Sequence, residues 1–234
     1  MLKFVLPGLI IAIISYLLGS ISFSIIVTKK FANIDVRTVG SGNAGATNVL
    51  RAAGLKASLL VFLLDFLKCA LSVFIGSLTF MIASNFFEYG DVGILRFYGA
   101  YIAGISCFTG HIYPVYFQFR GGKGVVTYAA MMAMIDWRLC VIELAVFILI
   151  VATSKMVSLG SVGTILLHPI LTFLMTYFVD YKLGILTVWG GASIEYVIAS
   201  CCFAVVFAIA ITSKHTANIK RILKGEESKI KFKK

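Results

Sequence analysis

Long apolar runs alternate with short polar segments along the whole chain of 234 residues. Most of these runs are close to the ~20 residues that a helix needs to cross the hydrocarbon core of a bilayer. The pattern predicts an all-α fold, a polytopic transmembrane helical bundle of about seven spans forming a single domain over residues 1–234. We expect the spans at residues 4–27, 57–84, 94–112, 124–136, 139–153, 157–178 and 184–212.

Two of these spans are weakly defined. Residues 124–153 form one apolar stretch that is broken only by Asp136, Trp137 and Arg138. Divided into two helices, the stretch gives spans shorter than usual. Kept as one helix, it makes the number of spans even and moves the basic C-terminal tail to the other side of the membrane.

The distribution of basic residues decides between these alternatives and sets the orientation. The chain is 60% hydrophobic, far above a soluble domain, and its formal net charge is +11. Of its 21 Lys and Arg, 16 lie in the segments 28–56, 113–123, 154–156 and 213–234. The positive-inside rule places these segments in the cytoplasm and the N-terminus outside, with the cell (plasma) membrane as the location. The first apolar run has no small-residue cleavage site, so we expect a retained helix.

The segment 110–127 carries a loop with the sequence Gly-Gly-Lys-Gly between two apolar runs. Glycines allow a backbone to approach an anion closely, and Lys123 adds a point charge. The loop predicts a phosphate site at the membrane surface, although a basic turn between helices has the same composition. It lacks the spacing of the nucleotide P-loop. His111, just before the loop, is either a substrate ligand or a structural residue.

A second segment, residues 35–51, combines glycines with hydroxyl and amide side chains and with Arg37 and Arg51. Small residues let a ligand come close, and arginine matches phosphate oxygens with two parallel donors. This composition indicates a second anion-binding loop, with a flexible glycine-rich linker as the alternative.

Two further polar segments lie near the C-terminus. Ser158 and Ser161 share a helical face, although serines in membrane helices often bond only to their own backbone. His215 and Asn218 share a face just outside the last span. That segment predicts either a second part of the site or a basic helix that anchors the chain at the membrane surface.

Charged residues inside a membrane span need a partner. Asp65 and Lys68 are three residues apart in the second span, and we expect them to pair and to hold helices together near the site. The five cysteines lie in or beside apolar runs without a Cys-x-x-Cys pair, so we expect neither a disulfide framework nor a metal site.

In this order, the four polar segments resemble the bacterial acyl-phosphate:glycerol-3-phosphate acyltransferase family. The resemblance is carried by Gly40-Ser41-Gly42-Asn43-x-Gly45-Ala46-Thr47-Asn48-x-x-Arg51, by Gly110-His111-x-x-Pro114 with Phe119-x-Gly121-Gly122-Lys123-Gly124, by Val157 to Ser161, and by His215 to Glu227. Glu227 fits the spacing of the last motif, and Glu226 is the adjacent choice. Ser22 stands where the family commonly has Pro, and Lys155 where it commonly has Arg.

The resemblance implies an enzyme that transfers a fatty acyl group from acyl phosphate to glycerol 3-phosphate, giving lysophosphatidic acid. Its partners would be these two substrates and membrane lipids, with no cofactor, metal, nucleic acid or obligate protein partner. The expected catalytic residues are Ser41, Arg51, Lys123, Ser161, His215 and Asn218. The expected substrate-binding residues are Gly40, Gly42, Asn43, Thr47, Asn48, His111, Gly121, Gly122, Gly124, Ser158, Glu226 and Glu227.

Two other classes of function fit parts of the pattern. A transporter of an anionic metabolite would explain the spans and the glycine loops, but transporters commonly place their ligands near the midplane, on broken helices. A lipid-binding scaffold would explain the basic tail and leave the glycine loops unexplained. Product formation by the purified protein in detergent separates an enzyme from both.

Overall fold

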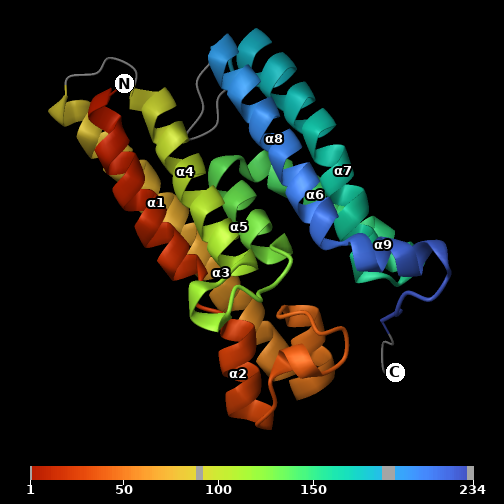
Figure 1. The fold of residues 1–234 in the computed structure, drawn as a ribbon. Coiled ribbons are helices and arrows are strands. Elements are labelled where there is room, and N and C mark those ends of the chain that lie inside the picture. Colours follow the sequence, from red (N-terminus) through yellow and green to blue (C-terminus); the bar gives the residue numbers. More distant parts are fainter. Residues whose placement is uncertain (1, 88–91, 186–192, 231–234) are drawn as a thin grey trace. The chain divides into compact units, whose positions relative to one another are not determined.

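The computed structural model describes residues 2–87, 92–185 and 193–230, and all regular structure in these ranges is helical (Figure 1). The longer helices are α1 (Val5–Gly19), α2 (Phe23–Ala32), α3 (Ala46–Phe86), α4 (Val92–Ile112), α5 (Val125–Ile135), α6 (Trp137–Ser154), α7 (Val157–Phe173), α8 (Ile194–Lys214) and α9 (Thr216–Leu223). Short turns of 3-10 helix are η1 (Leu2–Phe4), η2 (Val36–Thr38) and η3 (Val115–Phe117), and α7 continues as a π-helix, η4 (Leu174–Lys182).

Six helical segments among the described residues are long and apolar enough to cross a membrane. The predicted all-α transmembrane class is therefore confirmed. The stretch 124–153 is indeed two helices, because Asp136 ends the first and caps the second. Its carboxylate accepts hydrogen bonds from the backbone N–H groups of Arg138 (3.0 Å) and Leu139 (3.4 Å). The short α5 would be the seventh span, and the number of spans and their orientation stay predictions.

Three predicted boundaries were wrong. Helix α3 begins at Ala46, well inside the predicted loop 28–56, because the Leu, Arg and Ala residues that follow favour helix. Gly54, at φ 81° and ψ −178°, then separates this first part from the membrane-crossing part. The first span is interrupted after Gly19, and a new helix starts at Phe23. The last span begins at Ile194, and residues 186–192 of the predicted span lie outside the described residues.

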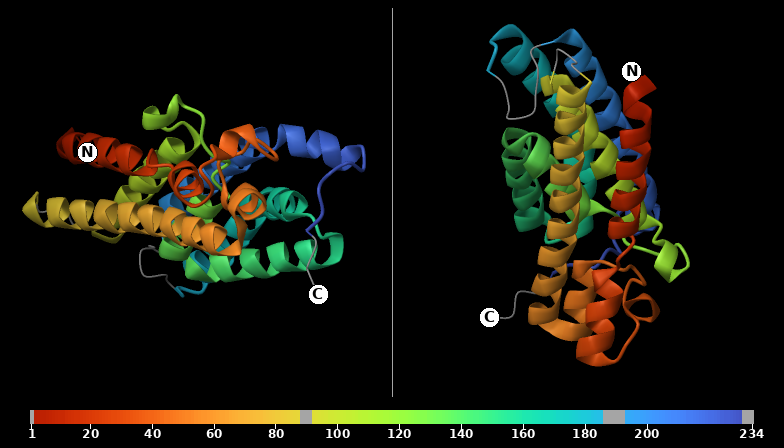
Figure 2. Two further views of the ribbon diagram at one scale, coloured as in Figure 1. Left: turned by 90° about the horizontal axis from the view of Figure 1, so that it is seen from below. Right: turned by 90° about the vertical axis from the view of Figure 1, so that its left-hand side faces the viewer.

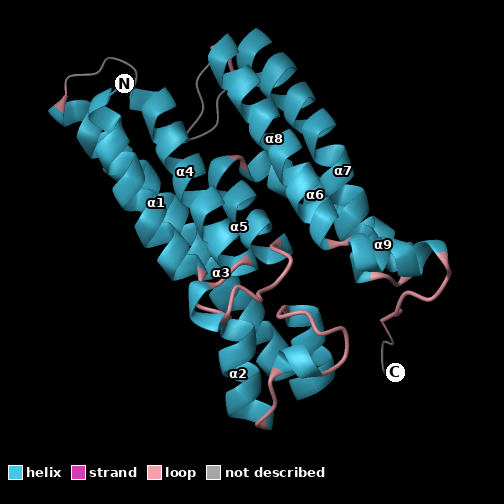
Figure 3. Cartoon of the chain, viewed as in Figure 1, coloured by secondary structure: helices cyan, strands magenta, loops and turns pink. Residues whose placement is uncertain are grey.

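Contacts divide the chain into two compact units, residues 1–135 (unit 1) and 136–234 (unit 2). In unit 1, α3 packs against α1, α2, α4 and α5 (Figure 2). Small residues permit close packing in unit 1, since a side chain on Gly76 of α3 would collide with the Gly99 carbonyl of α4, and one on Gly19 of α1 with the Cys107 carbonyl of α4. Both glycine-rich segments are loops at the same end of unit 1 (Figure 3).

In unit 2, α7 packs between α6 and α8 and carries a continuous row of buried polar side chains. The spacing of three or four residues places the row on one helical face. His168 Nδ1 lies 2.5 Å from the Glu143 carboxylate on α6, and Thr176 donates to the Thr172 carbonyl (2.7 Å). The row, called the polar stripe below, consists of Ser158, Ser161, Thr164, His168, Thr172, Thr176 and Asp180.

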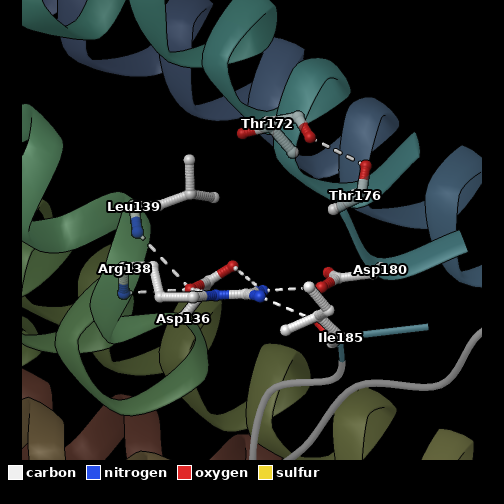
Figure 4. Close-up of polar contacts among 7 residues, drawn as sticks. All are labelled: Asp136, Arg138, Leu139, Thr172, Thr176, Asp180 and Ile185. Carbon is white, nitrogen blue, oxygen red and sulfur yellow. Dashed lines mark hydrogen bonds and ion pairs between the residues drawn. The ribbon is translucent and has the colours of Figure 1, made fainter. Parts of the chain in front are cut away.

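At the Asp180 end of the polar stripe, Arg138 binds the Asp180 carboxylate (Figure 4). Its Nη2 donates to Asp136 (3.0 Å) and to Asp180 (2.7 Å), and its Nη1 donates to the Ile185 carbonyl (2.9 Å). Asp180 is fully buried, so its charge depends on this arginine. The cluster joins the start of α6 to the end of η4.

Candidate functional site

The first glycine loop is organised by the side chain of Asn48. Its two amide hydrogens go to the carbonyls of Val36 (2.8 Å) and Val39 (2.9 Å), and its oxygen accepts from the N–H of Ser41 (3.1 Å). Asn48 is also almost completely buried. Asn48 therefore shapes the loop, and both of its amide hydrogens are bound within it. A direct role in substrate binding stays a prediction.

Glycine is required at two positions of this loop. Gly40 (φ 58°) and Gly42 (φ 68°) both have left-handed backbone conformations, and a side chain on Gly40 would collide with Asn48 Oδ1. Several predicted site residues of the segment 35–51 lie at the surface. Ser41 of the loop and Thr47 and Arg51 of α3 are exposed, and Asn43 is partly exposed.

The second glycine loop uses two of its backbone N–H groups internally. Gly121 donates to the Ile112 carbonyl (3.2 Å) and Gly122 to the His111 carbonyl (3.1 Å). These N–H groups consequently face the chain, where we had expected them to face an anion. Helix α5 begins directly after Gly124, and the first N–H groups of a helix have no partner within it. The start of α5, beside Lys123, is therefore where this loop can bind an anion.

Each glycine of the second loop fills a place with no room for a side chain. A Cβ atom on Gly121 would collide with the His111 carbonyl, and one on Gly124, at φ 85°, with the Phe108 ring. A Cβ atom on Gly122 would meet His111 Nε2 and, at 2.7 Å, the carbonyl oxygen of Ala44. Since Ala44 belongs to the first loop, the two glycine loops touch at Gly122.

Arg37 joins the two loops a second time. Its Nη1 donates to the Phe117 carbonyl (3.0 Å), while Nη2 and Nε bind the Asp35 carboxylate (2.7 and 3.1 Å). These hydrogen bonds hold the pKa of Asp35 below its usual range and raise the pKa of Arg37. Sequence reasoning missed this framework role, although an acidic and a basic residue two positions apart in a loop are a recognisable signal.

His111 lies beneath the second loop and is buried with the ion pair of Lys68 and Asp65, whose Nζ and Oδ1 atoms are 2.8 Å apart. The predicted pairing of Asp65 with Lys68 is confirmed. The arrangement favours the structural reading of His111, and a direct contact with substrate stays a prediction.

In unit 2, Glu227 joins the last two predicted segments, Val157 to Ser161 and His215 to Glu227. One carboxylate oxygen accepts from Ser158 Oγ (2.8 Å) and from Asn218 Nδ2 (2.7 Å), and the other accepts from Arg221 Nε (2.7 Å). Burial would raise the pKa of Glu227, but these hydrogen bonds outweigh it, and the pKa lies below its ordinary value. Glu226 is exposed, so Glu227 is the acidic residue that this motif places among the polar groups.

Residues 224–230 fold back over the start of α7, where the Ile230 N–H donates to the Lys155 carbonyl (2.8 Å). At the junction of α8 and α9, His215 is buried and its Nδ1 lies 2.8 Å from the Ile211 carbonyl. A carbonyl only accepts, so Nδ1 carries the hydrogen and Nε2 of the neutral ring is the basic nitrogen. Ser161 donates to the Val157 carbonyl (3.0 Å), as serines in membrane helices often do.

A shallow apolar groove of about 310 Å³ runs between α1 and α4 in unit 1. The groove ends at Thr109, one residue before Gly110, where α4 meets the end of α1. Nearby, the Tyr16 hydroxyl donates to the Tyr113 carbonyl (2.9 Å). The groove is thus continuous with the residues that precede the second glycine loop. Its lining consists of Ala12, Ile13, Tyr16, Ile105, Ser106 and Thr109.

The chain is similar to known glycerol-3-phosphate acyltransferases over nearly its whole length. A glycerol-3-phosphate acyltransferase of Clostridioides difficile (strain 630) is 40% identical over 226 residues, covering 97% of both chains. One from Thermoanaerobacter sp. (strain X514) is 38% identical, covering 94% of this chain and 93% of the relative.

Two solved structures of PlsY (YgiH), an integral membrane glycerol 3-phosphate acyltransferase, have the same fold. The glycerol 3-phosphate form aligns with a TM-score of 0.70 and 32% identity, covering 96% of both chains. The lysophosphatidic acid form gives 0.68 and 31%, covering 96% of this chain and 95% of the other. The profile of the glycerol-3-phosphate acyltransferase family matches residues 9–225, and this chain therefore belongs to that family.

Proposed function

We propose that this protein transfers a fatty acyl group from acyl phosphate to the 1-hydroxyl of glycerol 3-phosphate. The products are 1-acylglycerol 3-phosphate (lysophosphatidic acid) and inorganic phosphate. The observation that carries the proposal is the likeness, over 96% of the chain, to a protein solved in glycerol 3-phosphate and lysophosphatidic acid forms. The acyl phosphate donor rests on the motif resemblance.

The glycine loops of unit 1 suit a phosphate group. The start of α5 supplies backbone donors, Lys123 a cation within the same loop, and Arg51 a second cation beyond the first loop. The loops are fixed to each other by Arg37 and by the contact between Gly122 and Ala44. A site of this kind holds an anion without having to reorganise when it binds. We assign it to glycerol 3-phosphate.

The chemistry needs little beyond positioning, because an acyl phosphate is already an activated anhydride. The 1-hydroxyl oxygen forms a bond to the acyl carbon, the bond from that carbon to the phosphate oxygen breaks, and phosphate leaves with the electron pair. The hydroxyl proton goes to His215 or to a substrate phosphate. Holding the two groups in line supplies up to roughly 7–11 kcal/mol of the barrier in the best cases.

The remaining catalytic assignments follow from the motifs. We assign Ser41, exposed on the first loop, and Asn218 and Ser161 of unit 2 as donors to the developing oxyanion and the departing phosphate. For this role Ser161 must turn its hydroxyl hydrogen away from the Val157 carbonyl. Glu227 binds the Asn218 side chain through Nδ2 and so fixes the direction of its amide. Ser158 is held by the same carboxylate. We assign Glu227 and Ser158 to positioning.

The apolar groove between α1 and α4 is our candidate for the acyl chain. The surface of the groove is mostly apolar, although Tyr16, Ser106 and Thr109 carry hydroxyl groups, and the groove ends beside the segment that leads into the second glycine loop. A lipid-like substrate would then reach the loop from within the bilayer. From the positive-inside rule we assign the loops to the cytoplasmic side of the cell membrane.

The proposal is tested with purified protein in detergent, offered glycerol 3-phosphate with acyl phosphate, acyl-CoA or acyl-carrier protein as separate donors. We expect lysophosphatidic acid from acyl phosphate alone, with no product from the Lys123→Ala variant. Product from acyl-CoA or acyl-carrier protein and none from acyl phosphate would overturn the assigned donor. Because no compartments exist in detergent, product formation also excludes a protein that only transports an anion.

A further inference from the structure

Lys68 is buried in the middle of unit 1, where a charge is costly unless it is bound on all sides. Its Nζ donates to the carbonyls of Gly19 (3.0 Å) and Ile21 (2.7 Å), the segment in which α1 ends and α2 has not begun. It also lies 3.2 Å from His111 Nδ1 and 2.8 Å from Asp65 Oδ1. One side chain of α3 therefore contacts the break after α1 and the end of α4.

The hydrogens of the Lys68 ammonium group can be assigned. An ammonium has three hydrogens and cannot accept a bond. Asp65 Oδ1, 2.8 Å from Nζ, is the counter-ion of the ammonium. The other contacts of Nζ within hydrogen-bonding distance are the two carbonyls and His111 Nδ1, and in the contact with Nδ1 the ammonium can only be the donor. His111 Nδ1 is consequently an acceptor, and the neutral ring carries its hydrogen on Nε2.

The other side of the His111 residue supports the second glycine loop. The His111 carbonyl accepts the N–H of Gly122 (3.1 Å), and ring atom Nε2 is one of the two atoms that a Cβ on Gly122 would strike. The second is the carbonyl oxygen of Ala44, in the first loop. The ring therefore fills the space under the point where the two glycine loops meet.

We propose that Asp65 and Lys68 are positioning residues for glycerol 3-phosphate binding, acting through the His111 ring to fix where the two glycine loops meet. The inference rests on the proposed function and deepens it. It differs from simple pairing of helices, because the same ammonium group that ties α3 to the break after α1 also sets the orientation and tautomer of His111. Substitution of Lys68 or Asp65, although both are buried in the membrane, should therefore weaken the binding of glycerol 3-phosphate at the loops.

The test compares Lys68→Met, Asp65→Asn and His111→Gln in steady-state kinetics with each substrate varied separately. Loss of a hydrogen bond from a charged donor predicts a KM for glycerol 3-phosphate raised at least ~10-fold in Lys68→Met. The KM for acyl phosphate should change less than ~2-fold. A purely structural role would lower the fraction of active protein and leave both KM values unchanged, which would overturn the inference.

The double variant Lys68→Met with His111→Gln tests whether Lys68 acts through His111. We expect its KM for glycerol 3-phosphate to rise no further than in the worse single variant, whereas multiplied effects would show independent action. If Lys68→Met does not fold, Asp65→Asn and His111→Gln form the same cycle. Thr79→Val is the matched control, since this α3 hydroxyl bonds only to its own helix at Ile75 and should leave both KM values unchanged.

A second measurement does not depend on turnover. Glycerol 3-phosphate should raise the Tm of the wild-type protein and of Thr79→Val in detergent, and should raise that of Lys68→Met much less at equal concentration. An equal rise in all three would overturn the inference. If the proposed function itself were wrong, the wild-type protein would form no lysophosphatidic acid, which is a different result from unchanged KM values in active variants.

Discussion

Gly122→Ala is the sharpest single test of the phosphate site. The new methyl group would lie 2.7 Å from the Ala44 carbonyl oxygen, about 0.7 Å short of ordinary contact at 3.4 Å, with the His111 ring on its other side. One loop must move, and overpacking of this kind costs about 1–3 kcal/mol. Binding the phosphate requires the original loop geometry, so the cost reappears on binding. The KM for glycerol 3-phosphate should rise about 5- to 150-fold.

The assay is steady-state kinetics with each substrate varied, together with thermal unfolding in detergent. We expect kcat and the KM for acyl phosphate to change much less than the KM for glycerol 3-phosphate. Gly8→Ala in α1 is the matched control, because its methyl group meets only the side chains of Phe80 and Ile102 at ordinary contact distances of 3.6 and 3.8 Å, and helix propensity favours alanine there. An unchanged KM for glycerol 3-phosphate, with activity intact, would refute the assignment of the phosphate site.

Three further predictions concern topology, chemistry and pH. Single cysteines at positions 43 and 123, in a cysteine-free background, should be labelled from the cytoplasmic side and one at position 89 from outside; labelling of 43 and 123 from opposite sides would disprove a site on one face. Radiolabelled acyl phosphate without acceptor should leave no label on the acid-quenched protein, and replacing all five cysteines with Ala should keep substantial activity, whereas an adduct that chases into product would establish an acyl-enzyme. Glu227→Gln should lower the Tm at pH 7, where the carboxylate is charged. The difference in Tm between the variant and the wild type should become smaller as the pH falls below 4.5, the ordinary pKa of glutamate, and through the lowered pKa of Glu227. A difference in Tm that does not change with pH would mean that the charge of Glu227 contributes nothing to stability.

Hydrophobic pattern alone was sufficient for the fold class and for most spans, because apolar length determines which segments enter a bilayer. It located the break at Asp136, where the charged residues interrupt the run. It failed at Ala46, where helix continues into a glycine-rich segment, since local propensity there outweighs the glycine signal. The break after Gly19 depends on Lys68, a residue 49 positions away, and no local pattern reports such a contact.

The sequence identified the segments that carry glycines and polar side chains, and their part in substrate binding stays a prediction. Residue types alone did not give the contacts within these segments. Residue types did not show that the Asn48 amide donates to carbonyls of its own loop. Nor did they show that the N–H groups of Gly121 and Gly122 donate to backbone carbonyls. These roles depend on the direction in which each group points, which only the folded backbone determines.

The polar stripe of α7 has a consequence for how the protein is made. Helix α7 and its extension are apolar enough on average to enter the bilayer, yet one face presents seven polar side chains from Ser158 to Asp180. Facing lipid, that row would have few partners and a high cost. In the folded protein Glu143 of α6 contacts this row and α8 packs against α7, so the row is covered only when both neighbouring helices are in place. We therefore expect α7 to be stable in the membrane only after α8 has been inserted, and a chain that ends before α8 to be less stable than the full-length protein.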